Sequence, residues 1–336
     1  MKRLIVPLFM CFALLMGCAS PARRQGAGYA PAEDRRLVVY TSHKEEIYKP
    51  IIQEFEERTG VWVQVESGGT TEMLEQIALE SDYPLGDLMF GGGVESLEAY
   101  SGYFTAFTPE GMDKVHSGYY LPGSKWLPFS SLPIVLIYNP KLAGNDIPEG
   151  WSSLMDGRWK GQIAFASPEV SGSSYTALAT LLQVLPMEDD AILRGFFENL
   201  GGRILGGSGE VVGAVADGDF LIGVTLEETA KKGIAAGADI AMVYPAEGTS
   251  DVPDGAAILK GCAHEENARL FISFILGLDV QKRLVSDYSR RSVRSDLMAA
   301  SGARELTLMD YDIRWAGSRK SAVLSLWGQL VREATP

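Results

Sequence analysis

Apolar and polar positions follow a repeating order after residue 36. Three apolar runs of strand length are each followed by an amphipathic helical pattern, with strands at 36–40, 61–65 and 87–90 and helices at 44–58, 72–80 and 94–102. Gly60 marks the end of the first helix. Strands that alternate with helices are typical of a parallel α/β sheet. We therefore predict such a sheet for the first part of the chain.

A second α/β unit is predicted to begin at the apolar strand 134–139. Its expected elements are strands at 162–166 and 221–224 and helices at 175–185, near 190–200 and at 227–236. The runs 241–245 and 254–259 then indicate a return to the first unit, and helices close the chain after residue 265. We expect two lobes with C-terminal helices packing across them: 37–132 and 248–300 in lobe 1, 133–247 in lobe 2, and 301–336 at the C-terminus.

The N-terminus carries the pattern of an export signal. Lys2 and Arg3 precede an apolar run over 4–16 that is too short to span a bilayer as a mature helix. The run leads into Gly17-Cys18, and a small residue before cysteine resembles the bacterial lipobox. That resemblance implies cleavage after the signal 1–17 and acylation of Cys18, with an ordinary signal peptide as the alternative. We expect 18–36 to be a flexible tether and the lipid to be the only membrane attachment.

The net charge narrows the class of binding partner, and the cysteine content excludes an internal disulfide in the exported domain. The formal charge of −13 becomes −15 when Lys2 and Arg3 leave with the signal, which argues against nucleic acid and against polybasic membrane binding. Cys11 and Cys18 belong to the leader region, so the exported domain keeps only Cys262 and forms no internal disulfide. We expect Cys262 to be a small buried apolar residue.

Several short motifs resemble one group of bacterial ABC-transporter solute-binding proteins. The group contains ferric-iron binders and relatives that bind phosphonates and phosphorylated sugars. The matching segments are 40–45, 55–60, 137–140, 159–161, 244–249 and 253–255. The resemblance implies the α/β type II periplasmic-binding-protein fold, with two lobes, two hinge crossings and a ligand cleft between the lobes. It also implies a monomer without a cofactor that delivers its ligand to an ABC permease.

The ligand set of the iron-binding branch is incomplete. That branch typically uses a histidine in the first loop, which His43 matches, and a glutamate in the third loop. Here the third loop is 90–93, with no carboxylate until Glu95. The branch also uses two adjacent tyrosines, which would fall within 223–227, where there is none. Ferric iron prefers phenolates and carboxylates, so we expect no metal site and keep iron as the alternative ligand.

The predicted cleft loops are rich in hydrogen-bond donors. Hydroxyl and glycine residues stand before four predicted helices, where free N–H groups and the helix dipole favour an anion. Each loop alone is more often a helix cap than a binding site. Together they predict a small anionic ligand: a phosphonate, a sugar phosphate or phosphate. The expected ligand-binding residues are Thr41, Ser42, His43, Gly69, Thr70, Thr71, Gly92, Gly93, Ser131, Ser171, Gly172, Ser173, Ser174, Thr225, Glu227 and Asp254.

Charged residues near the predicted hinge are further candidates. Glu227, Glu228 and Asp254 offer acceptors to sugar hydroxyls or to an amine. Arg290, Arg291 and Arg294 offer positive charge, although arginines in a polar turn are more often surface residues. We expect the charge of His43 to depend on pH.

The sequence holds no recognisable catalytic motif. His43, His116 and His264 fall in separate segments, and neither a P-loop nor a Gly-x-Ser-x-Gly elbow is present. We therefore predict a binding protein and no enzyme. A ligand-sensing subunit of a membrane receptor would use the same fold and stays open as an alternative.

Overall fold

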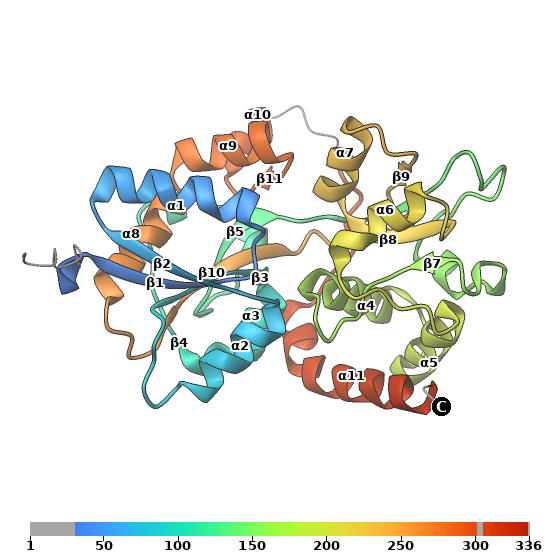
Figure 1. Cartoon of the computed structure of the whole chain (residues 1–336), viewed down its shortest axis with the longest axis horizontal. Helices are drawn as coiled ribbons and strands as arrows, with labels where there is room; N and C mark the ends of the chain where they lie inside the picture. The colour runs from blue at the N-terminus through green and yellow to red at the C-terminus, as the bar shows by residue number, and fades with distance from the viewer. Residues whose placement is uncertain (1–30, 301–304, 335–336) are drawn as a thin grey trace, which may run out of the picture.

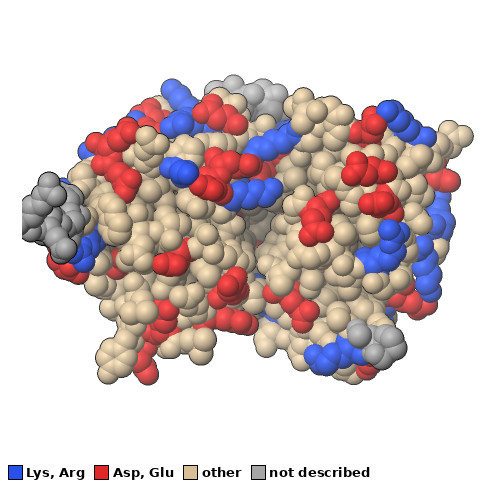
Figure 2. All heavy atoms as spheres, in the orientation of Figure 1, with Lys and Arg blue, Asp and Glu red and all other residues tan. Residues whose placement is uncertain are grey.

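Two α/β lobes lie side by side in the computed structural model, which describes residues 31–300 and 305–334 (Figure 1). The expected signal, Cys18 and most of the expected tether lie outside the described residues. A furrow separates the two lobes on the face shown in Figure 2, and basic and acidic side chains lie together along its upper edge.

Lobe 1 is built on a mixed sheet with the strand order β11-β5-β10-β3-β1-β2, and β4 pairs with β10. Its strands are β1 (Arg36–Thr41), β2 (Trp62–Ser67), β3 (Leu88–Gly93), β4 (Phe104–Thr105), β5 (Leu127–Ser131), β10 (Pro253–Leu259) and β11 (Arg291–Ser292). Its helices are α1 (Glu45–Thr59), α2 (Thr70–Leu79), α3 (Val94–Ala99), α8 (Glu265–Ile275), α9 (Leu278–Tyr288) and α10 (Ser295–Ala300).

The parallel sheet predicted from the first three strands is correct for β2, β1 and β3 only. β10 runs antiparallel to β3 and to β5, because the chain re-enters lobe 1 from the opposite direction after it has built lobe 2. The helical predictions follow their apolar faces. In α1, Ile47, Ile51 and Phe55 are buried on one side, and Gly60 ends the helix with a φ of 69°, a conformation that glycine adopts without strain.

Lobe 2 has a four-stranded sheet with the order β7-β8-β6-β9. Its strands are β6 (Ile134–Tyr138), β7 (Ile163–Ala164), β8 (Ile222–Leu226) and β9 (Ala241–Val243), and its helices are α4 (Gly172–Val184), α5 (Asp189–Leu200), α6 (Val211–Ala216) and α7 (Glu227–Ala235). Short 3-10 turns complete both lobes at Glu33–Arg35, Ser101–Tyr103, Met112–Lys114, Ser117–Tyr119, Trp151–Met155, Gly157–Trp159 and η7 (Ser208–Glu210).

The chain crosses between the lobes at two neighbouring places and is then closed by one long helix. The first crossing joins β5 to β6 through 132–133, and the second joins β9 to β10 through 244–252. Helix α11 (Ile313–Ala334) runs under lobe 2 (Figure 1). Trp327 of α11 is buried in the lobe 2 core, whereas Gly317 lies against α3 of lobe 1, where a Cβ would be 3.0 Å from the Glu95 carbonyl oxygen. Helix α11 therefore contacts both lobes.

Cys262 packs against the apolar clusters of lobe 1 and has no disulfide partner among the described residues. Burial raises the pKa of its thiol to about 12. The thiol therefore stays protonated at neutral pH and is a poor nucleophile, as expected of a packing residue.

Candidate functional site

A cavity of about 350 Å³ lies between the lobes, at the carboxyl ends of strands from both sheets. Ligands of open α/β sheets bind at this end of the strands, because loops there lead into helix N-termini. The cavity takes Ser42 from the loop after β1, Gly92 and Gly93 from the end of β3, and Thr225 from β8. The first turns of helices contribute a large part of its remaining wall.

Small and hydroxyl residues of lobe 1 form one wall. Gly69 and Thr70 begin α2 beside Gly92, whose φ of 83° is a left-handed conformation that favours glycine. A Cβ at Gly92 would also lie 2.6 Å from the Thr70 methyl carbon. Both the backbone conformation and the available space thus require glycine here, which brings main-chain atoms to the cavity surface.

The opposite wall comes from the start of α4 in lobe 2. Ser171 is the N-cap, and its hydroxyl accepts a hydrogen bond from the backbone N–H of Ser174 at 3.3 Å. The Ser171 and Ser173 hydroxyl oxygens are 3.2 Å apart. Ser171 therefore serves the helix, whereas Ser173, in the first turn and lining the cavity, is available to a ligand.

The two walls touch at a pair of glycines. A Cβ at Gly69 would lie 2.9 Å from the carbonyl oxygen of Val170, and a Cβ at Gly172 would lie 2.7 Å from the Thr70 hydroxyl oxygen. Contacts this short exclude a side chain at either position. Glycine at both positions lets the two helix N-termini approach across the cleft.

His43 is buried rather than exposed in the cleft wall. Its ring centroid lies 4.5 Å from that of Phe90 and 5.6 Å from that of Phe129, and its Nε2 is 3.5 Å from the Asp254 carboxylate. Burial, helped by the positive charge of Arg290, holds the pKa of His43 well below its ordinary value. The expected pH-dependent charge is therefore absent near neutral pH, where His43 is a neutral imidazole.

Arg290 lines the cavity, but carboxylates already neutralise it. Its Nη1 is 2.7 Å from Asp254 Oδ2, and its Nε is 2.9 Å from Glu228 Oε2. Burial raises the pKa of Asp254. Burial also opposes ionisation of Glu228, but the Arg290 guanidinium outweighs it and lowers the pKa of that carboxyl. A ligand therefore meets a hydrogen-bonded ionic cluster here rather than a free cation.

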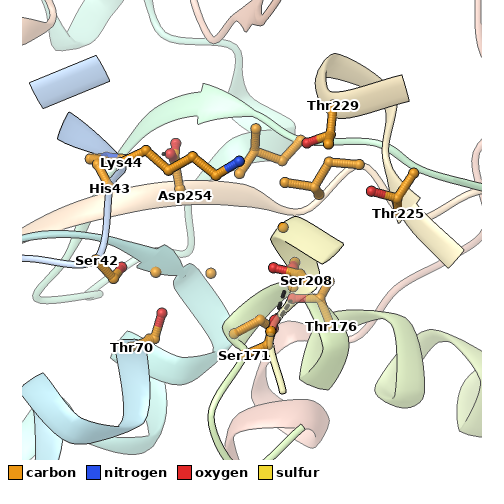
Figure 3. A pocket seen from close by; sticks show the side chains of 18 of the residues that line it. Ser42, His43, Lys44, Thr70, Ser171, Thr176, Ser208, Thr225, Thr229 and Asp254 are labelled. Carbon is orange, nitrogen blue, oxygen red and sulfur yellow. Dashed lines mark hydrogen bonds and ion pairs between the residues drawn. The ribbon is translucent and has the colours of Figure 1, made fainter. Parts of the chain in front are cut away.

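Lys44 is the cationic residue of the cavity that sequence reasoning missed. It is the N-cap of α1, and its side chain extends across the cavity toward Thr229 of lobe 2 (Figure 3). Nearby carboxylates are already paired: Glu45 with Lys49 at 2.6 Å and Glu46 with Lys232 at 3.2 Å. Within the part of the chain that the structure describes, no carboxylate lies within 4.0 Å of the Lys44 ammonium. Its charge helps to lower the pKa of Glu228 but forms no ion pair with it, so the ammonium is available to an anionic ligand.

Several expected ligand residues do not line the cavity. The Thr41 hydroxyl donates to the Phe90 carbonyl oxygen at 2.6 Å and so holds β1 to β3. Ser174 donates its N–H to Ser171 and turns into the lobe 2 interior. Thr71, one position after Thr70 on α2, is also absent from the cavity wall. In each case a neighbouring residue takes the cleft-facing position.

Ser131 and Glu227 belong to the hinge instead. The Ser131 hydroxyl donates to Asp251 on the second crossing. Glu227 accepts from Arg291 Nε at 2.8 Å and from the Tyr244 hydroxyl. Burial opposes ionisation of Glu227, but the hydrogen bonds from Arg291, Tyr244 and Lys231 outweigh it and lower its pKa to about 2.

Two of the three arginine candidates do not reach the cavity. Arg291 pairs with Glu227 at the hinge and does not line the interlobe cavity. Arg294 pairs with Asp296 at 2.7 Å and donates to the Leu276 carbonyl oxygen, outside the cleft. Arg290 alone of the three reaches the cavity.

Lobe 2 also contributes a glycine-rich loop that was missed. Gly206 and Gly207, which precede η7, line the cavity together with Ser208 and Gly209, the first two residues of η7. The run has the same small-residue signal as the four loops singled out from the sequence. Thr176 of α4 and Thr229 of α7 are further cavity residues without a sequence signal of their own.

Metal-binding geometry is not seen around the cavity. Among residues 31–300 and 305–334, no three His, Cys, Asp or Glu side chains gather in a way that would hold a metal ion. Asp254, Glu228 and His43 do lie near one another, but Arg290 occupies the space between the two carboxylates.

Known proteins share this architecture. AfuA of Actinobacillus pleuropneumoniae, a periplasmic binding protein with fructose-6-phosphate bound, matches with a TM-score of 0.78 and 23% identity over 89% of this chain and 99% of its own. The periplasmic binding protein P5PA matches with a TM-score of 0.77 and 22% identity over 88% of this chain and 99% of its own. The Fe(3+)-binding periplasmic protein of Serratia marcescens is 24% identical over 296 residues, 84% of this chain and 86% of its own.

These likenesses confirm the two-lobed periplasmic-binding-protein fold expected from the sequence. The family model described as "Bacterial extracellular solute-binding protein" matches residues 87–305, which include both crossings and the whole of lobe 2 as far as α7 and β9. The chain therefore belongs to the bacterial extracellular solute-binding proteins.

Proposed function

We propose that this protein captures a small oxyanion-bearing ligand, a phosphate monoester or phosphonate, in the interlobe cavity and delivers it to an ABC permease. Proteins of this family are binding proteins that pass small ligands to such permeases. The observation that carries the anion is that the ammonium of Lys44 lines the same cavity as the hydroxyls and helix N-termini of Thr70 and Ser173.

The cavity favours an anion through dipoles more than through net charge. The N-terminal turns of α2 and α4 direct backbone N–H groups toward the space between the lobes, and such groups stabilise negative charge. Arg290 is neutralised by its carboxylates and His43 is uncharged, so Lys44 is the cation that remains. One free cation together with neutral donors suits one oxyanion group.

The rest of the cavity suits a short polar body attached to that group. A volume of about 350 Å³ lies at the lower end of ordinary small-molecule sites. Thr225 and Thr229 face the cavity on the lobe 2 side, away from Ser42 and Thr70 (Figure 3). Hydroxyls on both sides support a ligand of the size of a phosphorylated sugar, and AfuA is a relative of this fold with fructose-6-phosphate bound.

Iron stays the competing cargo because the Serratia relative is a Fe(3+)-binding protein. The cavity wall offers no tyrosine, and its Asp254 and Glu228 carboxylates already bind Arg290. The hard anionic groups that iron prefers as ligands are therefore already paired with Arg290.

A thermal-shift screen followed by calorimetry tests the proposal. A ligand at a hundredfold excess over its Kd raises the free energy of unfolding by about 2.7 kcal/mol. We expect stabilisation by sugar phosphates, phosphonates or phosphate, and none by neutral sugars, cationic amino acids or ferric citrate. Stabilisation by ferric citrate with a coloured charge-transfer band would instead support iron.

Two variants connect the binding to the named residues. Ser173→Ala and Lys44→Met each remove one hydrogen bond to the charged group, which costs about 1.5–3 kcal/mol, or roughly ten- to a hundredfold in Kd. Lys49→Met is the matched control, because Lys49 lies one turn further along α1 and pairs with Glu45 at the surface. Equal affinity of Lys44→Met and Lys49→Met for the anion would contradict the proposed role of Lys44.

We further propose that the protein is exported and held at the membrane by an acyl chain on Cys18. The lipobox-like residues before Cys18 support this, as does the periplasmic location named for the relatives. None of the helices in the described ranges is both long and apolar enough to cross a bilayer.

A further inference from the structure

A buried carboxyl lies directly beneath the floor of the cavity. Glu95, in the first turn of α3, is 0% exposed. A Cβ placed on Gly93, which lines the cavity, would lie 2.5 Å from each of the two Glu95 carboxylate oxygens. The backbone of Gly93, a cavity residue, therefore packs directly against this carboxyl.

The Glu95 carboxyl is only half satisfied by hydrogen bonds. Its Oε1 accepts from the Thr176 hydroxyl at 2.6 Å, a bond that joins α3 of lobe 1 to α4 of lobe 2. Its Oε2 has no hydrogen-bond partner among the described residues. Thr176 itself lines the cavity (Figure 3), so the carboxyl is one hydrogen bond away from the cavity wall. A buried carboxylate with an unpaired oxygen costs more free energy than a neutral carboxyl in the same place.

The charged and titratable groups around Glu95 come from every neighbouring element. Helix α11 contributes Lys320, which is 3% exposed and donates to Ser96 Oγ at 2.6 Å rather than to Glu95 itself. The other ionisable groups nearby are Tyr175 on α4, Tyr311 and Asp312 before α11, Glu75 on α2, Glu98 on α3, Asp254 on β10, and its partner Arg290 just before β11. The nearest cation thus faces Glu95 without contacting its carboxylate.

We propose that Glu95 takes up a proton when an anion enters the cavity, so that ligand binding is coupled to pH through a carboxyl that never touches the ligand. This inference rests on the proposed anionic ligand. A charged Glu95 would repel an oxyanion held above Gly93 through a medium of low dielectric constant, whereas a protonated Glu95 would not. The anion therefore favours the protonated form, and by linkage protonation favours the anion.

The electrostatics of the unliganded site support this coupling. Burial raises the pKa of Glu95, against the opposing hydrogen bond from Thr176 and the charge of Lys320. Burial likewise lowers the pKa of Lys320 to about 8. We expect the pKa of Glu95 to rise further in the complex. The Kd for the anion should therefore be constant at pH values below the pKa of Glu95 in the unliganded protein. Above it, Kd increases by up to about tenfold per pH unit until the pKa of the complex is passed.

Calorimetry with fructose-6-phosphate in two buffers of different ionisation enthalpy measures the number of protons taken up. We expect wild type to take up more protons than Glu95→Gln, which cannot titrate, and the difference cancels the titration of the phosphate group itself. Glu98→Gln is the matched control, since Glu98 lies on the same helix and accepts from Trp126 Nε1 at 2.7 Å. It should behave as wild type.

Lys320→Met separates Glu95 from its neighbouring cation and does not depend on the folding of Glu95→Gln. Without Lys320 the carboxyl is harder to ionise, so the range of proton uptake should move to higher pH. Equal proton uptake by wild type and Glu95→Gln, or loss of uptake at every pH in Lys320→Met alone, would overturn the role of Glu95 and leave anion binding intact. Absence of binding by fructose-6-phosphate, phosphonates and phosphate to all variants would overturn the anionic ligand and the coupling with it.

Discussion

Whether a charged side chain in this cleft is available to a ligand depends on which other charges it already pairs with. Arg290 is the most buried cation of the cavity, yet it contributes no free charge because Asp254 and Glu228 enclose it. Lys44 is exposed, yet it provides the available charge because Glu45 and Glu46 bind other lysines. Burial and the proposed function are thus separated at the residue scale: the buried arginine binds two carboxylates of the site, and the exposed lysine is the residue that we propose binds the ligand.

Removing Arg290 should destabilise the folded protein strongly. Arg290→Met removes the guanidinium that both buried carboxylates bind and leaves Asp254 with Ser130 and Glu228 with the more distant Lys232, and breaking a buried pair typically costs about 3–5 kcal/mol in the free energy of unfolding. Urea unfolding at pH 7 measures this loss. Arg58→Met is the control, because Arg58 forms exposed ion pairs with Glu54 and Asp279, and should cost less than about 1 kcal/mol. Similar losses in both variants would contradict the assignment.

Glu227 should make the protein sensitive to acid. Its pKa is about 2 in the folded protein and 4.5 ordinarily, so its contribution is complete above pH 4.5 and is lost as pH falls from 4.5 toward 2. In Glu227→Gln the free energy of unfolding should be lower at pH 7 and should fall less than that of wild type across this range. Urea titrations at pH 7, 4 and 3 compare the two proteins. Parallel curves would show that another carboxyl carries the acid sensitivity.

Residue pairing also explains why the sequence predicted only part of the site. The loops with Thr70, Gly92 and Ser173 were recognisable because small residues before helices are a local signal. Lys44 was not recognisable. Its charge is available because Glu46 pairs with Lys232 instead, and those two residues lie 186 positions apart in the sequence. Glu227 looked like a ligand residue for the same reason, since its partner Arg291 is 64 positions away.

At the scale of elements, the pattern of apolar and polar residues predicted the amphipathic strands and helices and missed those without such a pattern. The first three strand–helix units appear where expected, because each has one apolar face. β5 was missed because it contains Pro128 and ends in two serines. The direction of β10 was also missed, because antiparallel pairing depends on the route the chain takes through lobe 2. Helix α4 begins at Gly172, three residues before the predicted start, where the Ser171 cap ends the preceding loop.

The first turn of α4 should separate stability from binding. Ser171→Ala removes the N-cap and should lower the free energy of unfolding by about 1 kcal/mol. Ser173→Ala, two positions later, keeps the cap and should leave unfolding nearly unchanged while weakening anion binding. Thermal unfolding of the unliganded proteins and calorimetry with a sugar phosphate measure the two effects. If Ser173→Ala unfolds early and binds normally, its hydroxyl serves the helix and not the ligand.

At the scale of the whole molecule, we predict that an acyl chain on Cys18, which lies outside the described residues, attaches the protein to the membrane. Acylation requires the Cys18 thiol, so Cys18→Ser should move the protein from the membrane fraction to the soluble fraction. Fractionation and immunoblotting of the expressing cells measure the distribution. Cys262→Ser is the control, because that thiol is packed within lobe 1. Recovery of Cys18→Ser in the membranes would contradict the lipid anchor.

Helix α11 also determines when the chain can fold during secretion. The core of lobe 2 combines residues between Ile134 and Val224 with Ala316, Val323 and Trp327 of α11. The core of lobe 1 likewise joins Leu37 to Val293, so both cores depend on contacts between distant segments, which form slowly. Lobe 2 cannot complete its core until its last helix has been synthesised. A polypeptide with this arrangement cannot reach its complete native fold while it is being made, and a narrow secretion channel accepts a chain that has not yet folded.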